Sequence, residues 1–255
     1  MKLGFVGTGT ITEAVVTGLM KARSDIEEIV VSPRNPEIAG RLAARYPVVR
    51  IGADNQAVVG GSEIVFLAVR PQIATEVIEP LQFRAGQHVV SFIAVTQIET
   101  LRTWIKIPVE ISRAIPLPFV ADLQGATAIY PPDEKIADLF SSLGVAVQTN
   151  EIRQYDLLGA ASALMGTYFG LLEASARWLE AEGMPYDQAG LYLKQLFSGL
   201  SQAALASGAA SFEEMRAEFS TKGGLNEQVF TEFVANGGTD ALAAALRSVF
   251  LRIRG

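Results

Sequence analysis

The sequence predicts an α/β fold: a doubly wound parallel sheet over residues 1–150, followed by an all-α domain over residues 151–255. Two observations predict this division. Short apolar stretches alternate with helical stretches up to about residue 150, a pattern typical of parallel strands joined by right-handed crossovers. After residue 150 no strand-like stretch follows, and long helical stretches succeed one another. We therefore expect two domains with different folds.

The chain opens with a strand, a glycine-rich turn and a helix. The apolar run Leu3–Val6 is followed by Gly7 and Gly9, and a helical pattern begins at Thr10. Gly7 allows a tight turn, and Gly9 leaves room for a pyrophosphate against the backbone. The first helical residues, Thr10 and Ile11, offer unpaired N–H groups at the positive end of the helix dipole. This order indicates a Rossmann-like dinucleotide-binding domain.

Six further apolar stretches in the first domain are expected to form strands. The strongest signal is Glu63–Val69, which is nearly all apolar, as for a strand buried on both faces. A helix is expected to begin at Pro36, because Asn35 can cap it and proline suits the first helical position. The other expected strands are 29–31, 48–51, 88–92, 109–113 and 126–130.

Five helices are expected in the second domain. The first should run unbroken over 153–182 and end at Gly183, and its apolar middle must be buried in a core or against another subunit. Pro185 opens the second helix. Ser211 and Glu214 have the spacing of a capping box. The last two helices are expected after a loop at 220–224 and after Gly237–Gly238, with Thr239 as the cap.

Composition excludes several classes of function. The net charge of −6, with Lys and Arg scattered along the chain, argues against a nucleic-acid partner. The chain has no cysteine, which excludes disulfides and thiolate catalysis. Its only histidine, His88, precedes a predicted strand without an organised carboxylate cluster, so no metal site is expected.

No membrane association is expected. The chain enters a strand at once, so no signal peptide is predicted. The longest uncharged run, Leu157–Leu172, is shorter than the roughly 18 residues of a membrane span. A soluble, cytoplasmic protein is the expectation.

The residues after the second predicted strand favour NADP(H) over NAD(H). An NAD site usually carries Asp or Glu there to bind the ribose hydroxyls, whereas this chain carries Ser32 and Arg34. Ser32 could donate to a 2′-phosphate, and Arg34 could pair with it bidentately. Asn55, at the start of another predicted helix, could also reach the nucleotide.

The end of the strongest strand should also face the cofactor. Carboxyl ends of parallel strands border the ligand in this fold. We therefore expect Ala68, Val69, Arg70 and Pro71 to line the nicotinamide half of the site.

Four segments together resemble the pyrroline-5-carboxylate reductase family: Gly4–Ala14, Leu67–Gln72, Gly125–Tyr130 and Ser220–Gly224. The resemblance covers nearly the whole chain. It implies an NADPH-binding domain, a helical domain that forms a homodimer or a larger homo-oligomer, and an active site between them. The implied activity is NADP-dependent reduction of a small cyclic imino acid, such as 1-pyrroline-5-carboxylate to proline, or of a close analogue.

The substrate half departs from the family pattern. The family's Met-Pro-Asn segment is here Ile115–Leu117, and its Ser-Gly-Ser-Gly-Pro stretch is Ala163–Thr167. Its proline before the paired glycines is Lys222, and the two threonines after them are Leu225 and Asn226. The cofactor half is therefore kept better than the substrate half.

The glycine-rich loop of the second domain is the expected substrate site. By resemblance it holds the carboxylate of a small anionic substrate. Gly223 and Gly224 let backbone approach a ligand, and Thr221 and Lys222 add a hydroxyl and a cation. Lys222 could pair with the carboxylate or donate a proton, with Thr221 beside it, and Asn226 could bind substrate or cap the next helix.

Two alternatives to the imino-acid reductase remain open. One is an enzyme that exchanges hydride between NADP and a deazaflavin cofactor, since such enzymes share the opening domain. The other is a non-catalytic NADP-binding module that senses the nucleotide or scaffolds a partner.

Overall fold

The computed structural model describes residues 1–255 as two compact units. The first comprises Met1–Gly159 together with Ile253–Gly255, and the second comprises Ala160–Arg252. The chain therefore passes between the units twice, after Gly159 and after Arg252.

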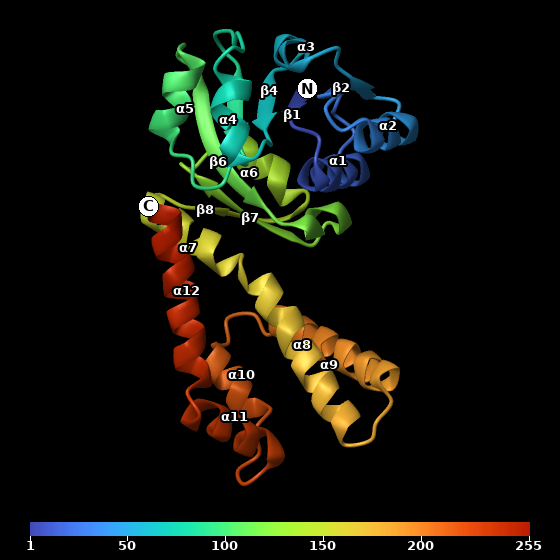
Figure 1. Ribbon diagram of the computed structural model, residues 1–255, viewed down its shortest axis with the longest axis vertical. Helices are drawn as coiled ribbons and strands as arrows, with labels where there is room; N and C mark the ends of the chain where they lie inside the picture. The colour runs from blue at the N-terminus through green and yellow to red at the C-terminus, as the bar shows by residue number, and fades with distance from the viewer. The chain divides into compact units, whose positions relative to one another are not determined.

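An eight-stranded sheet forms the centre of the first unit (Figure 1). The strand order is β3-β2-β1-β4-β5-β6-β7-β8. The chain thus builds outward from β1 in one direction and then, from β4, in the other, as in a doubly wound fold. The strands are β1 (Lys2–Val6), β2 (Glu28–Val31), β3 (Val49–Ile51), β4 (Ile64–Leu67), β5 (His88–Ser91), β6 (Glu110–Pro116), β7 (Gly125–Tyr130) and β8 (Gly144–Gln148).

The sheet is mixed rather than wholly parallel, which corrects the prediction at one pair of strands. All neighbours are parallel except β6 and β7, which run antiparallel with Arg113 opposite Tyr130. The connection between them holds only a short 3₁₀ helix, Pro118–Asp122. A parallel connection needs a crossover of a dozen or more residues, so this short segment returns the chain in the opposite direction. Strand β8 was not predicted.

Seven helices accompany the sheet. Asn35 caps the second of them as predicted, with its Oδ1 accepting from the Ile38 N–H at 3.2 Å and Pro36 at the first position. The helices are α1 (Thr10–Ala22), α2 (Pro36–Arg45), α3 (Asn55–Gly61), α4 (Pro71–Ile78), α5 (Ile98–Ile105), α6 (Glu134–Ser141) and α7 (Ile152–Ala161).

Two apolar cores lie on the two faces of the sheet. Alternate residues of β4 enter different cores: Ile64 and Phe66 join one, and Val65 and Leu67 join the other. All four are completely buried, as the apolar run predicted. Phe66 stacks on Phe5 with ring centroids 4.6 Å apart. Burial at roughly 25 cal/mol per Å² of apolar surface makes these cores the main stabilising term of the unit.

The second unit consists of helices. They are α8 (Leu164–Ala181), α9 (Tyr186–Ala206), α10 (Phe212–Glu218), α11 (Leu225–Ala235) and α12 (Gly238–Arg254). The Ser211–Glu214 capping box and the left-handed Gly183 at the end of α8 are both present, as predicted. Thr239 was wrongly expected to cap the last helix: α12 begins at Gly238, so Thr239 lies in its first turn.

The predicted helix over 153–182 is divided in two. The division lies at Ser162–Ala163, where the Ala163 N–H bonds to the Ala160 carbonyl at 3.1 Å in a tight turn. No Gly or Pro marks this turn, so the apolar pattern continues across it. Taken together, α7 and α8 contain an 18-residue window with mean hydropathy 1.3, of which 6% is buried. By length and composition alone this stretch could cross a membrane, although the turn at Ser162–Ala163 interrupts it.

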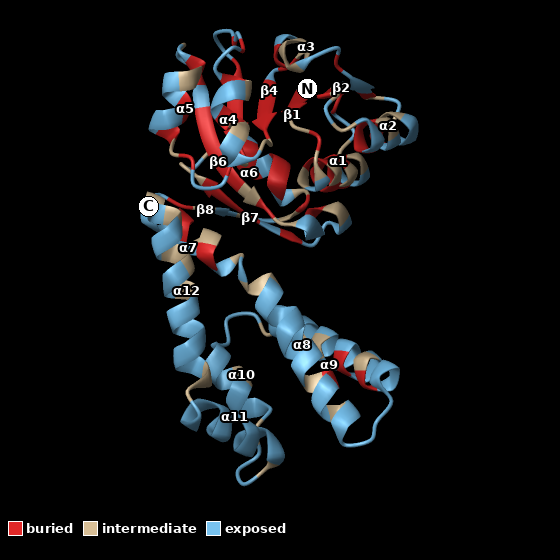
Figure 2. Cartoon of the chain, in the orientation of Figure 1, coloured by how far each residue is buried: buried red, intermediate tan, exposed pale blue.

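The helical unit buries few of its side chains (Figure 2). In α8 and α9 only Ala176, Ala189 and Leu193 are buried, and α10, α11 and α12 contain no buried residue. Many large apolar side chains are exposed instead, among them Trp178 at 64% and Leu191 at 72%. An isolated chain would leave this apolar surface in water.

Candidate functional site

The glycine turn lies where the winding of the sheet reverses. β1 is flanked by β2 and β4, and all three run parallel, so their carboxyl ends share one edge. Gly7 has φ of +105°, and a Cβ there would lie 2.4 Å from the Ala68 carbonyl oxygen. Both its conformation and this contact require glycine. The turn therefore packs directly on the segment that follows β4.

The N-terminus of α1 is open for a ligand. Gly9 is the residue before the helix, no side chain caps it, and a Cβ there would meet nothing within 4 Å. The first-turn N–H groups, which include those of Thr10 and Ile11, have no acceptor within the helix. Thr12 is buried, and its hydroxyl donates to the Gly7 carbonyl at 2.7 Å. This bond ties the helix to the turn.

Ser32 holds the glycine turn in place, a structural role that was not predicted beside its expected contact with a 2′-phosphate. It is 1% exposed, and its Oγ accepts from the Gly7 N–H at 3.0 Å. The Thr8 hydroxyl donates to the Ser32 carbonyl at 2.7 Å, so the proton between the two side-chain oxygens comes from Ser32. Thr8 is a residue that the fingerprint pattern, which leaves this position open, did not single out.

Three other expected cofactor residues follow the carboxyl ends of parallel strands: Arg34 follows β2, Asn55 follows β3 and Arg70 follows β4. Arg34 follows β2, is exposed and makes no ion pair. Arg70 is exposed and precedes α4, in which Pro71 takes the first position. Asn55 is half-buried at the start of α3, where Asp54 rather than Asn55 is the cap, accepting from the Ala57 N–H at 2.7 Å.

A second polar group lies at the carboxyl ends of β5 and β6, and sequence reasoning missed it. Arg113, Tyr155 and Asp156 are each at most 3% exposed and line a cavity of about 130 Å³. The Arg113 guanidinium lies over the Tyr155 ring at 4.6 Å. Burial raises the pKa of Tyr155 and the pKa of Asp156, and the nearby Arg113 opposes both shifts. Arg113 stands about 40 residues before Tyr155 and Asp156 in the sequence, so no local motif could have revealed the group.

The loop that borders this cavity is strained. Val95 has φ of +65°, a left-handed conformation that β-branched residues rarely adopt. Such a residue costs of order 1–3 kcal/mol and persists only where its surroundings hold it. Val95 is 46% exposed. Strain of this kind is concentrated at ligand sites.

His88 lies in a buried hydrogen-bonded group away from this edge, at the beginning of β5. Its Nε2 is 2.8 Å from Asp133 Oδ2 and 3.1 Å from the Ser112 hydroxyl, which itself donates to Asp133 at 2.8 Å. The same imidazole nitrogen faces both the Ser112 hydroxyl and the Asp133 carboxylate. In a Ser-His-Asp triad the two partners face different ring nitrogens, so this group is not such a triad. Burial lowers the pKa of His88. No group of three or more potential metal ligands is found in the chain.

In the helical unit, the Thr221–Asn226 loop has its polar groups partly engaged. Gly223 is left-handed at +74°, and its N–H donates to Glu227 at 2.6 Å. Asn226 donates to the Phe219 carbonyl at 2.7 Å. Thr221 and Lys222 are exposed. A substrate carboxylate on this loop would therefore compete with Glu227 for one N–H group.

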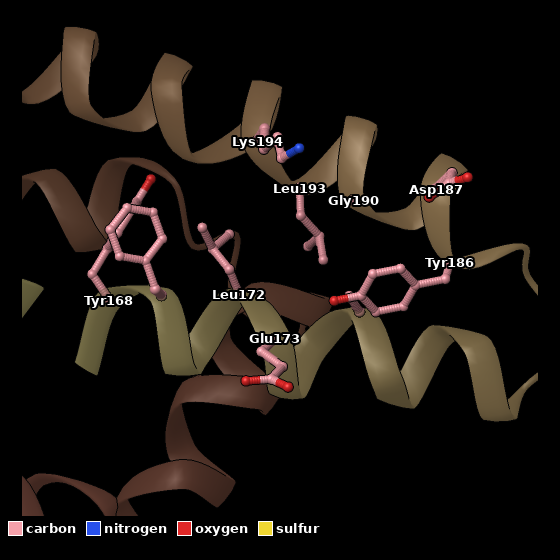
Figure 3. A pocket seen from close by; sticks show the side chains of 10 residues that line it. Tyr168, Leu172, Glu173, Tyr186, Asp187, Gly190, Leu193 and Lys194 are labelled. Atoms are coloured by element: carbon pink, nitrogen blue, oxygen red, sulfur yellow. The ribbon is translucent and has the colours of Figure 1, made fainter. Parts of the chain in front are cut away.

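Two of the hollows on the helical unit are lined by both α8 and α9. One, of about 480 Å³, lies between α8 and α9, where Leu172 and Leu193 face each other and Tyr168 and Tyr186 flank them (Figure 3). Its charged residues are Glu173, Asp187 and Lys194. The other, of about 700 Å³, has mainly apolar walls. Both belong to the exposed apolar surface of this unit.

Two family models match separate parts of the chain. Residues 2–95 match the family model "NADP oxidoreductase coenzyme F420-dependent", and residues 153–255 match "Pyrroline-5-carboxylate reductase dimerisation". The resemblance to the pyrroline-5-carboxylate reductase family is confirmed. The helical half thus matches the model of this family's dimerisation domain.

Relatives along the whole chain carry the same name. The pyrroline-5-carboxylate reductase of Pseudomonas aeruginosa is 25% identical, over 98% of this chain and 95% of that protein. That of Methanosarcina acetivorans is 28% identical, over 81% and 80%. The fold matches 1-pyrroline-5-carboxylate reductase from Streptococcus pyogenes with a TM-score of 0.85 at 22% identity, covering 100% of this chain and 98% of that one.

Proposed function

We propose that this protein is an NADPH-dependent reductase of a small cyclic imino acid, 1-pyrroline-5-carboxylate or a close analogue, with proline or its analogue as product. The observation that carries the proposal is the order of the two matched domains in one chain. Relatives that match 98% and 81% of this chain are named pyrroline-5-carboxylate reductase.

The residues of the first unit fit the cofactor. The uncapped α1 N-terminus and the open space beside Gly9 suit a pyrophosphate. Arg34, exposed and without an ion-pair partner, suits a 2′-phosphate and favours NADPH over NADH. When bound, the reduced nicotinamide supplies a hydride to the carbon of the C=N bond. The chain's own task is to orient the protonated imine and to exclude water.

The remaining assignments belong to the same proposal. Cofactor binding is assigned to residues 1–150, with Gly7, Gly9, Asn55 and Ala68–Pro71 as further contacts. Residues 151–255 form a homodimer or larger homo-oligomer, which covers the exposed apolar helices. Thr221, Lys222, Gly223, Gly224 and Asn226 are assigned to an anionic substrate. The enzyme works in the cytoplasm.

One alternative retains a specific observation in its favour. The model that matches residues 2–95 is described by a coenzyme F420-dependent activity. Hydride exchange between NADP and a deazaflavin is therefore the second candidate. It ranks lower because the helical half matches a domain named for pyrroline-5-carboxylate reductase.

A steady-state assay of NADPH oxidation separates the candidates. The full chain is offered 1-pyrroline-5-carboxylate, other cyclic imines with and without a carboxylate, open-chain keto acids, and an oxidised deazaflavin. Turnover of the cyclic imino acids supports the proposal. Turnover of the deazaflavin alone supports the alternative, and tight NADPH binding without any turnover rejects both enzymes.

A further inference from the structure

Val95 has a left-handed backbone that no helix end explains. Three residues other than glycine have positive φ: Val95, Lys106 and Leu123. Lys106 caps α5 and Leu123 caps the 3₁₀ helix, and the N–H of each bonds back to a carbonyl of the preceding turn. A left-handed residue there is an ordinary way to end a helix. Val95 ends no helix, and its β-branched side chain makes the conformation still less favourable.

Packing does not compensate for the strain at Val95. The residue is 46% exposed and belongs to neither apolar core of the first unit. It also lines the cavity of about 130 Å³, so part of its surroundings is unfilled. Glycine would adopt the same conformation without strain. The fold therefore does not require the isopropyl group, and strain of this kind indicates a contact with a ligand.

The loop that carries Val95 is fixed at both ends. At its start, the Ile93 N–H donates to the Ser91 hydroxyl oxygen at 3.2 Å. At its end, Gln97 Oε1 accepts from Arg113 Nη1 at 3.2 Å. Ser91 and Arg113 are buried side chains of β5 and β6. A loop supported in this way presents its side chains to a ligand at fixed positions.

The position of the loop in the sheet relates Val95 to the hydride transfer. β4 and β5 run parallel with Leu67 paired to Ser91, so the segments that follow the two strands are neighbours. The segment after β4 is Ala68–Pro71, which is assigned to the nicotinamide half of the cofactor, and the segment after β5 carries Val95. Hydride transfer requires the reacting atoms to approach to about 3–3.5 Å. A side chain beside the nicotinamide therefore limits the room for the ring that is reduced.

We propose that Val95 is a specificity-determining residue of the reductase, whose isopropyl group lies beside the nicotinamide and limits the size of the imine ring that can receive the hydride. The inference rests on the proposed function and leaves the substrate carboxylate on the Thr221–Asn226 loop. It gives the enzyme a preference for a five-membered ring over a six-membered one. One methylene in an apolar pocket changes kcat/KM by about 10- to 200-fold.

Steady-state kinetics of the full chain with two imines tests the role of Val95. The substrates are 1-pyrroline-5-carboxylate and its six-membered homologue, 1-piperideine-6-carboxylate, and the measured quantity is the ratio of their kcat/KM values. Val95→Gly and Val95→Ala should each shift this ratio towards the larger ring by about 10-fold or more. Alanine removes most of the side chain but keeps the strain. A shift with glycine alone would assign the effect to the backbone and overturn the inference.

Two control variants separate the side-chain contact from a disturbance of the fold. Val95→Thr keeps the β-branched shape and should keep the ratio within about twofold of the native value. Val145→Gly makes the same change as Val95→Gly on the exposed strand β8, and it should also keep the ratio. A loop that is merely disturbed would lower both kcat/KM values together and leave the ratio unchanged.

The outcomes distinguish this inference from the proposed function. If the native chain reduces 1-pyrroline-5-carboxylate but has no preference for the smaller ring, or if the Gly and Ala variants keep the native ratio, Val95 has no such role and the reductase stands. If the native chain reduces neither imine, the proposed function fails and the inference fails with it.

A crystal structure of the full chain with NADP⁺ and L-proline gives an independent test. The methyl groups of Val95 should lie within about 4.5 Å of the nicotinamide or the proline ring, the distance of an apolar contact. A Val95 side chain turned away from both rings would overturn the inference.

Discussion

At the scale of single residues, cofactor choice depends on Arg34. Replacement by Ala should weaken NADPH binding by about 10- to 100-fold and leave NADH binding within about twofold, because only the 2′-phosphate pair is lost. Arg102→Ala, at another exposed arginine, is the control. Calorimetry with both cofactors measures the effect. Equal loss for NADPH and NADH would show that Arg34 does not contact the 2′-phosphate.

Val95 gives a second test at this scale. Val95→Gly should raise the free energy of unfolding by about 1 kcal/mol, because glycine accepts the left-handed conformation at little cost. Val145→Gly, on an exposed strand, should lower it instead. Urea titrations with unchanged slopes would make the two midpoints comparable. A drop for both variants would mean that Val95 is not strained.

Residue roles were predictable from sequence only where geometry is local. The turn at Gly7 and Gly9 and the cap at Asn35 follow from spacing alone. The part that Ser32 plays in holding the glycine turn was not foreseen, because its partners Gly7 and Thr8 lie 24 to 25 residues away. Arg113 and Asp156 were not foreseen, since only the closed sheet brings them to one cavity.

At the scale of elements, the group around His88 joins β5, β6 and the start of α6. Asp133, Glu110, Lys135 and Ser112 surround the imidazole, and burial lowers its pKa below the ordinary 6.5. The unfolded chain therefore takes up the proton first as pH falls. This contribution to stability is complete above about pH 6.5 and declines below it, by at most about 1.4 kcal/mol per pH unit.

His88→Gln should flatten this part of the stability curve. Denaturant unfolding between about pH 7.5 and 5.5 should show a smaller decline for the variant than for the native chain. Carboxylates titrate mainly below this window. Parallel curves for the two proteins would exclude His88 as the source of the decline.

The order of elements was more predictable than their directions. Apolar runs located seven strands, because burial on one or both faces imposes a local pattern. The reversal between β6 and β7 depends on a connection that is short in space, and the division of α7 from α8 has no Gly or Pro to mark it. Neither the reversal nor the division changes the pattern of apolar residues in the sequence.

At the scale of the whole molecule, the exposed apolar helices predict self-association. Trp178→Glu should dissociate the native oligomer or shift its midpoint to higher protein concentration, because a charge would enter the apolar surface. Ile51→Glu, at an exposed residue of β3, should not. Light scattering across a concentration series measures both. A native chain that is monomeric at all concentrations would contradict the prediction.

The return of the chain to its first unit has a consequence for synthesis. Gly159 and Ile253 line the same cavity but are separated by the whole helical unit. Translation at about 5–20 residues per second needs roughly 5–20 s to make the roughly 90 residues between them. During that interval the sheet can form on the ribosome while one wall of the cavity is still absent. A nascent chain would thus complete its sheet before this cavity is closed, and the last residues of the chain would finish the first unit.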